Sequence, residues 1–145
     1  MELNQTYEDA PRTFCKCFAS DCTACTKCLR YICHQHLNTQ DENFLYISSH
    51  LIKPEKGTDC PYFRPDKKVR LACGFLEALD KMPAKISRNI RTELRQKYGS
   101  SNFYRYMNGQ IPLDNKQQMD FIDDFLTLGA TFPIEFDSYI EIYNW

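Results

Sequence analysis

The residues in this sequence that are best able to bind a metal or to react are cysteines near its start. Six of the eight cysteines lie in one short stretch, namely Cys15, Cys17, Cys22, Cys25, Cys28 and Cys33. Two histidines follow, His34 and His36, and the other two cysteines, Cys60 and Cys73, stand apart. A metal ion needs several ligands that converge on one point, and closely spaced cysteines on tight turns supply them at low entropic cost. The cluster therefore indicates metal binding.

Disulfide bonds are the main alternative use for an even number of cysteines in a short chain. They persist only in oxidising compartments, and residues 1–4 do not begin a signal peptide, which would place a basic segment before an apolar one. The apolar runs are also far shorter than the roughly 18 residues of a membrane helix. We therefore expect a cytoplasmic protein without membrane association, in which the cysteines are thiolate ligands.

The spacing leaves the identity of the metal open. Cys22, Cys25 and Cys28 are spaced like the first three ligands of a bacterial iron–sulfur cluster, and Cys60 precedes a proline as the remote ligand of such a cluster does. A tetrahedral zinc ion needs only four ligands and tolerates irregular spacing. Additional or alternative ligands are Cys15, Cys25, Cys33, His34 and His36. We expect Zn²⁺, with an iron–sulfur cluster as the alternative cofactor and thiols without metal as a third interpretation.

Fragments spread over most of the chain resemble a family of small uncharacterised bacterial proteins. They are Cys17-Phe18, Cys22, Cys28-Leu29-Arg30, Cys60-Pro61-Tyr62-Phe63-Arg64, Gly74-Phe75, Phe103-Tyr104-Arg105-Tyr106 with Gly109, and Phe136-Asp137-Ser138-Tyr139. The resemblance implies a principal metal set of Cys17, Cys22, Cys28 and Cys60, and supplies no function. In that set Cys60 closes a loop of about thirty residues, so the metal acts as a structural staple for a segment poor in apolar residues.

The elements around the cysteines are predicted to be short. A helix is expected near residues 27–36, and a strand within residues 43–53, where aromatic and β-branched residues are concentrated. Residues 55–68 read as a loop that carries Cys60. From residue 69 onward the sequence indicates helix, in which Cys73 is expected to be a small core residue.

Three capped or terminated helices are expected in the second half of the chain. The first begins at Pro83 and ends at Gly99, and its apolar face is formed by Ile86, Ile90, Leu94 and Tyr98. The second is short and ends at Asn108-Gly109. The third is capped by Asp114, and its inward face consists of Met119, Ile122, Phe125 and Leu126. Residues 132–145 return as a helix or a strand.

The long helix, the turn at Gly99 and the short helix resemble the helix-turn-helix of Cro/C1-type repressors. In that motif the second helix lies in the major groove. The resemblance implies that bases or phosphates contact Ser101, Asn102, Arg105 and Asn108. We therefore predict an α+β, mainly α fold. A Cys-rich metal knuckle over residues 1–68 precedes a helix-turn-helix-like helical bundle over residues 69–145, and the two form one compact unit.

Charge is distributed unevenly along the chain, although the formal net charge is only −1. Seven bases and one acid lie between Lys81 and Arg105, whereas one base and seven acids lie between Tyr106 and Trp145. The basic segment is typical of a phosphate-binding surface, to which we assign Arg88, Arg91, Arg95 and Lys97. The alternative is a solvated helix face whose bases pair with Asp120, Asp123 and Asp124.

No motif in the sequence defines a catalytic reaction. There is no Ser-His-Asp set, phosphate loop or pair of catalytic carboxylates, and a Cys-dominated site lacks the His-rich, open coordination of a hydrolytic zinc enzyme. We predict a non-enzymatic, zinc-stabilised protein that binds nucleic acid or acts in regulation, with no small-molecule substrate. The alternatives are a protein–protein adaptor with a structural metal site and an iron–sulfur redox or sensor protein.

Overall fold

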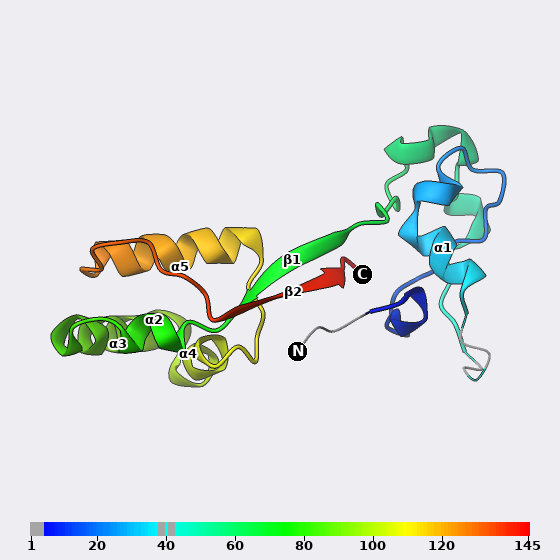
Figure 1. Ribbon diagram of the computed structural model, residues 1–145. Helices are drawn as coiled ribbons and strands as arrows, with labels where there is room; N and C mark the ends of the chain where they lie inside the picture. The colour runs from blue at the N-terminus through cyan, green and yellow to red at the C-terminus, as the bar shows by residue number, and fades with distance from the viewer. Residues whose placement is uncertain (1–4, 38–39, 41–42) are drawn as a thin grey trace. The chain divides into compact units, whose positions relative to one another are not determined.

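The computed structural model describes residues 5–37, 40 and 43–145, whose course is shown in Figure 1. They form two compact units. The N-terminal unit comprises residues 5–69 with Ile142–Trp145, and the helical unit comprises Arg70–Glu141. The chain is of mixed α/β type, because it combines helices with a two-stranded sheet of β1 (Lys68–Cys73) and β2 (Ser138–Tyr143). None of the helices in the described ranges is long and apolar enough to cross a membrane.

The N-terminal unit is built from short elements. Its one α-helix is α1 (Leu29–Gln35), which confirms the helix predicted near residues 27–36. Short 3-10 helices make up much of the rest, at Tyr7–Asp9, Cys25–Lys27, Ser49–Leu51 and Pro54–Asp59. The last of these occupies part of the stretch predicted to be a loop.

The strand predicted within residues 43–53 is wrong. Among the described residues its backbone pairs across the chain with one residue, Lys16, whose N–H donates to the Leu45 carbonyl at 2.8 Å and whose carbonyl accepts from Ile47 N–H at 2.9 Å. This contact is an isolated bridge. A strand needs a ladder of such pairs, and composition alone does not supply the partner.

The core of the N-terminal unit is small. Its buried cluster contains Phe14, Leu29 and Cys33, with aromatic rings from the two ends of the unit packed against it. Trp145 meets Phe14 edge to face, with ring centroids 5.5 Å apart. Polar contacts supplement this cluster, as where the Tyr7 hydroxyl donates to Asp66 at 3.0 Å. So little buried apolar surface makes polar links important to the stability of this unit.

The helical unit is held by a larger core. Its helices are α2 (Leu76–Asp80), α3 (Ala84–Tyr98), α4 (Ser100–Met107) and α5 (Asn115–Thr127). In Figure 1, α5 packs opposite α3 and α4. Phe75 lies at the centre, and its ring centroid is within 5.1 to 6.0 Å of the rings of Phe103, Phe121 and Phe125. Such aromatic clusters combine large buried area with favourable ring geometry.

The helix boundaries expected from the sequence are close to those observed. Pro83 is the N-cap of α3, one residue before its first helical position, and Gly99 ends it with φ of +81°. Asp114 caps α5, since its side chain accepts from Gln117 N–H at 2.8 Å. The Gln117 side chain in turn accepts from Asp114 N–H at 3.0 Å, which completes a capping box.

The inward face predicted for α5 is partly wrong. Phe125 is fully buried and Ile122 packs against the core, but Met119 is 60% exposed and Leu126 is 40% exposed. Phe121, which was not in the predicted set, is buried instead. Phe121 and Phe125 are four residues apart, so the inward face is centred on these two rings.

The helix predicted from residue 69 onward begins later than expected. Residues Lys68–Cys73 form β1, and α2 starts only at Leu76. Ala72 exchanges both of its backbone hydrogen bonds with Leu113, at 3.0 and 2.8 Å, which fixes an extended conformation. Cys73 is buried as expected, although it lies in a strand. In residues 132–145 the strand alternative is realised, as β2.

One carboxylate joins the start of α2 to the segment before β2. Asp137 N–H donates to the Gly74 carbonyl at 2.9 Å. Its carboxylate accepts from Leu76 N–H at 2.9 Å and from Glu77 N–H at 3.1 Å. These are backbone donors of the first turn of α2, which the residue before the helix leaves without a side-chain cap.

Replacing Asp137 by Ala should therefore destabilise the helical unit by about 1 kcal/mol, the typical cost of removing a helix cap. Urea unfolding monitored by far-ultraviolet circular dichroism measures this change. The matched control is Asp123→Ala, which removes an exposed carboxylate from α5. An equal effect of the two substitutions would contradict the capping role.

Candidate functional site

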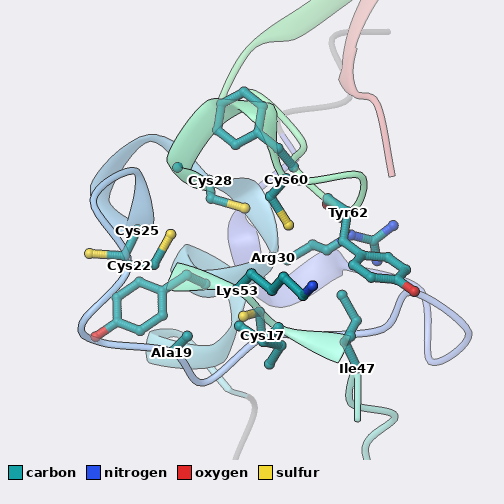
Figure 2. Close-up of a pocket in the computed structure, with 14 residues that line it drawn as sticks. Cys17, Ala19, Cys22, Cys25, Cys28, Arg30, Ile47, Lys53, Cys60 and Tyr62 are labelled. Atoms are coloured by element: carbon teal, nitrogen blue, oxygen red, sulfur yellow. Dashed lines mark hydrogen bonds between the residues drawn. The ribbon is translucent and has the colours of Figure 1, made fainter. Parts of the chain in front are cut away.

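Cysteines from three chain segments line one small cavity in the N-terminal unit (Figure 2). They include the whole set implied by the family resemblance, and they are Cys17, Cys22, Cys25, Cys28 and Cys60. Apolar residues such as Ile47 and Phe63 and the two cations Arg30 and Lys53 also line it. The cavity has a volume of about 30 Å³.

The spacing of three of these cysteines explains why they share the cavity. Cys25 N–H donates to the Cys22 carbonyl at 3.1 Å, and Cys28 N–H donates to the Cys25 carbonyl at 3.2 Å. The chain therefore turns once every three residues, as in a 3-10 helix, where side chains three positions apart lie on the same side. The pattern of one cysteine at every third position thus brings three cysteines to the lining of one cavity.

Backbone hydrogen bonds bring the other two segments to the same place. Cys17 N–H donates to the Arg30 carbonyl at 3.2 Å, which holds the first segment against α1. Leu29 N–H donates to the Arg64 carbonyl at 2.7 Å, which holds the segment after Cys60 at the start of α1. The beginning of α1 is therefore the point at which the three cysteine-bearing segments meet.

The Cys17 thiol is electrostatically coupled to the rest of its predicted set. Burial is the main cause that raises its pKa, and a backbone hydrogen bond with Ala19 lowers it. Smaller increases come from the thiols of Cys28, Cys22 and Cys60. These three are the predicted co-ligands, so Cys17 is near enough to each of them for their charges to affect its thiol.

Arg30 is the polar centre of this region. Its guanidinium donates from Nη1 to the Cys15 carbonyl at 2.6 Å and from Nε to the Tyr62 carbonyl at 2.8 Å. The guanidinium carbon lies 4.5 Å from the centroid of the Phe14 ring. Burial lowers the pKa of Arg30, and the charge of Arg64 lowers it further. One side chain thus joins three segments, a role that the fragment Cys28-Leu29-Arg30 did not reveal.

The donor set suits zinc by its chemistry. Among the described residues, however, no three Cys, His, Asp or Glu side chains are gathered closely enough to hold a metal ion. Binding therefore requires the thiols of Cys17, Cys22, Cys28 and Cys60 to turn into the cavity. The metal site and the identity of the metal therefore stay predictions.

The additional candidate ligands have different surroundings. Cys25 lines the cavity, but its thiol donates to the Ser20 carbonyl at 3.8 Å. Cys33 is fully buried in the core, which raises the pKa of its thiol to about 11. His34 Nδ1 is hydrogen-bonded to the Tyr46 hydroxyl at 3.0 Å.

Two further candidates also lie outside the cavity wall. The His36 ring stacks near Tyr7, with centroids 5.1 Å apart. Cys15 is half-buried, and its carbonyl is the acceptor for Arg30. Of the five additional candidates, the cavity therefore brings only Cys25 to the principal set.

The bases assigned to phosphate binding on α3 do not share one face. At 3.6 residues per turn, Arg88, Arg91 and Arg95 lie on one side of the helix, and Lys97 lies roughly half a turn away. Arg91 pairs with Asp80 at 3.2 Å. Arg95 Nε donates to the Arg91 carbonyl at 3.1 Å. Arg88 is exposed and makes no ion pair within the part of the chain that the structure describes.

Lys97 pairs with an acid of α5. Its ammonium group donates to both carboxylate oxygens of Asp124, at 2.6 and 2.7 Å, and this hydrogen bond raises the pKa of Lys97. The pair matches the alternative interpretation, in which bases of α3 meet acids of the third helix. Asp120 and Asp123 are exposed and form no ion pair within the described ranges.

The outer face of α4 carries the residues assigned to base or phosphate contact. All four are exposed, namely Ser101, Asn102, Arg105 and Asn108. The opposite face places Phe103 and Met107 in the core. The helix is thus fixed by its apolar side and presents its polar side to solvent.

Comparison with known proteins gives a family and no further relative. The model of a family described as a family of unknown function, DUF6078, matches residues 1–145. No curated protein and no solved structure gives a significant match.

Replacing Arg30 by Lys should lower the free energy of unfolding of the N-terminal unit by about 1–3 kcal/mol, because lysine cannot reproduce the two fixed donors. The single tryptophan, Trp145, belongs to this unit and reports its unfolding by fluorescence. Arg64→Lys is the matched control, expected to change stability by less than about 0.5 kcal/mol. Equal losses in both variants would show that Arg30 has no special role.

Proposed function

The chain belongs to the DUF6078 family, whose function is unknown, and we propose that it is a non-enzymatic, zinc-stabilised protein that binds nucleic acid. The observation that carries this proposal is the outer face of α4, on which Arg105 is exposed and free of ion pairs among the described residues. Arginine without an acid partner on a rigid, exposed helix is suited to phosphates and base edges.

The packing of α3 and α4 supports the interpretation of this unit as helix-turn-helix-like. The two helices are separated by Gly99 alone, at φ of +81°, where an added Cβ would meet no atom within 4 Å. A helix-turn-helix motif requires a second helix that packs on the core by one face and exposes its other face to DNA. Phe103 is fully buried in α4, whereas Asn102 and Arg105 are exposed.

We propose different roles for the basic residues. Arg88 and Arg95 are the α3 side chains best suited to phosphate contact, because Arg91 and Lys97 already pair with carboxylates. On α4, Arg105 is the candidate for a bidentate contact to guanine, and Asn108 is the candidate for adenine. Ser101 and Asn102 would contact the adjacent backbone.

In this proposal the metal has a structural role in the N-terminal unit. Zinc held by Cys17, Cys22, Cys28 and Cys60 would link three segments that share only a small apolar core. The positive charge of Arg30 beside these thiols would offset part of the negative charge of four thiolates. No chemistry at the metal is part of this function.

A protein–protein adaptor is the second candidate. It is favoured by the exposure of Met119 and Leu126, which lie seven residues apart and therefore on one stripe of α5. Asp120 and Asp123 border this stripe and would favour a partner with basic residues.

The test is a titration of metal-loaded, full-length protein with random-sequence duplex DNA at low and at moderate salt. Binding should weaken steeply as salt rises, because phosphate contacts release counterions. Arg105→Gln should weaken binding roughly tenfold, within the range expected for one arginine–base contact. Lys116→Gln, which removes the same charge from the start of α5, should have little effect. Absence of binding even at low salt would contradict the proposal and favour the adaptor.

A further inference from the structure

The cavity in the N-terminal unit is lined by one thiol more than a tetrahedral metal ion can use. The predicted ligands are Cys17, Cys22, Cys28 and Cys60, and Cys25 is the fifth cysteine of the wall. Figure 2 shows Cys25 at the same end of the cavity as Cys22. The Cys25 thiol donates to the Ser20 carbonyl at 3.8 Å, so it is already turned toward its own loop.

We propose that Cys22 and Cys25 are a thiol–disulfide site, which oxidants convert to a reversible Cys22–Cys25 disulfide. The two residues are the first and last of a tight turn, closed by the hydrogen bond from Cys25 N–H to the Cys22 carbonyl at 3.1 Å. The ends of such a turn have Cα atoms less than about 7 Å apart. Disulfides span Cα separations of roughly 4.4–6.8 Å. The turn therefore holds the two backbones close enough for a disulfide, which forms once the Cys25 side chain turns from the Ser20 carbonyl toward Cys22.

Accessibility favours this pair over the three buried cysteines, and the tight turn distinguishes it from Cys15, Cys17 and Cys60, which are also partly exposed. Cys22 and Cys25 are both partly exposed, whereas Cys28, Cys33 and Cys73 are buried. A dissolved oxidant reaches exposed thiols first. In a reducing compartment a disulfide of this kind is transient and serves to sense oxidants.

The reaction balances with a hydroperoxide as the oxidant. The Cys25 thiolate attacks one oxygen of hydrogen peroxide, the O–O bond breaks, and a sulfenic acid and hydroxide form. The Cys22 thiolate then attacks the Cys25 sulfur, so that the S–S bond forms as the S–O bond breaks and a second hydroxide leaves. With the two protons of the original thiols, the hydroxides become two waters. The two sulfur atoms together lose two electrons, and the peroxide gains them.

The consequence of this reaction rests on the proposed function, in which Cys22 is a zinc ligand. A disulfide withdraws Cys22 from the set and leaves three thiolates, so zinc is bound less tightly and is released. Oxidation would thus remove the zinc crosslink between the three segments of the N-terminal unit.

The test treats the full-length, zinc-loaded chain with one equivalent of hydrogen peroxide, followed by alkylation and digestion. Cleavage after Lys16 and Lys27 and before Asp21 gives residues 21–27, a peptide that contains only Cys22 and Cys25. We expect this peptide to lose the mass of two hydrogen atoms and to regain it with dithiothreitol. A zinc-binding dye should report release of the metal in parallel.

Cys25→Ser should bind zinc as the natural chain does but lose both the disulfide and the peroxide-triggered release. Cys15→Ser removes a half-buried thiol outside the cavity wall and should change neither readout. Unmodified residues 21–27 after oxidation, or zinc release that persists in Cys25→Ser, would overturn the inference. A disulfide in a chain that never held zinc would uphold the thiol–disulfide site and refute the metal proposal.

Discussion

The constraint on which the N-terminal unit depends is its shortage of apolar surface. Among the described residues its buried cluster consists of Phe14, Leu29 and Cys33 and is smaller than the core of the helical unit, so hydrophobic burial supplies less of the free energy that must order its three cysteine-bearing segments. Polar groups supplement it, above all Arg30, whose guanidinium bonds two carbonyl groups and stacks on Phe14. The convergence of cysteines at one cavity fits the same need. A bound metal would add the crosslink that a larger core provides in the helical unit.

The two units are stabilised in different ways, and this difference explains where polar side chains are exposed. Around Phe75 the helical unit has a continuous aromatic core, which leaves α4 free to present a polar face. Pairing of Lys97 with Asp124 and of Arg91 with Asp80 neutralises part of the basic segment. Within the described part of the chain, fewer cations of this segment are without an ion pair than the sequence alone indicated, and Arg105 is the one on the proposed contact helix.

Local signals in the sequence were sufficient for features set within a few residues. The ends of α3, the Asp114 cap and the shared wall of Cys22, Cys25 and Cys28 all follow from caps or from three-residue spacing. Features that depend on residues distant in the sequence could not be predicted from such local signals. β1 depends on Leu113, the cap of α2 comes from Asp137, and the placement of the segment after Cys60 depends on Arg30. Short apolar runs such as residues 69–79 also fit helix and strand equally well.

We propose that zinc held by Cys17, Cys22, Cys28 and Cys60 orders the N-terminal unit. The most direct test is a chelator titration of the purified chain, in which released zinc and the fluorescence of Trp145 are followed together. We expect one zinc per chain, whose removal shifts the Trp145 emission to that of a solvent-exposed ring while the helical circular dichroism of α3 and α5 persists. A chain purified without metal, which takes up no zinc and whose Trp145 emission is insensitive to chelator, would contradict it.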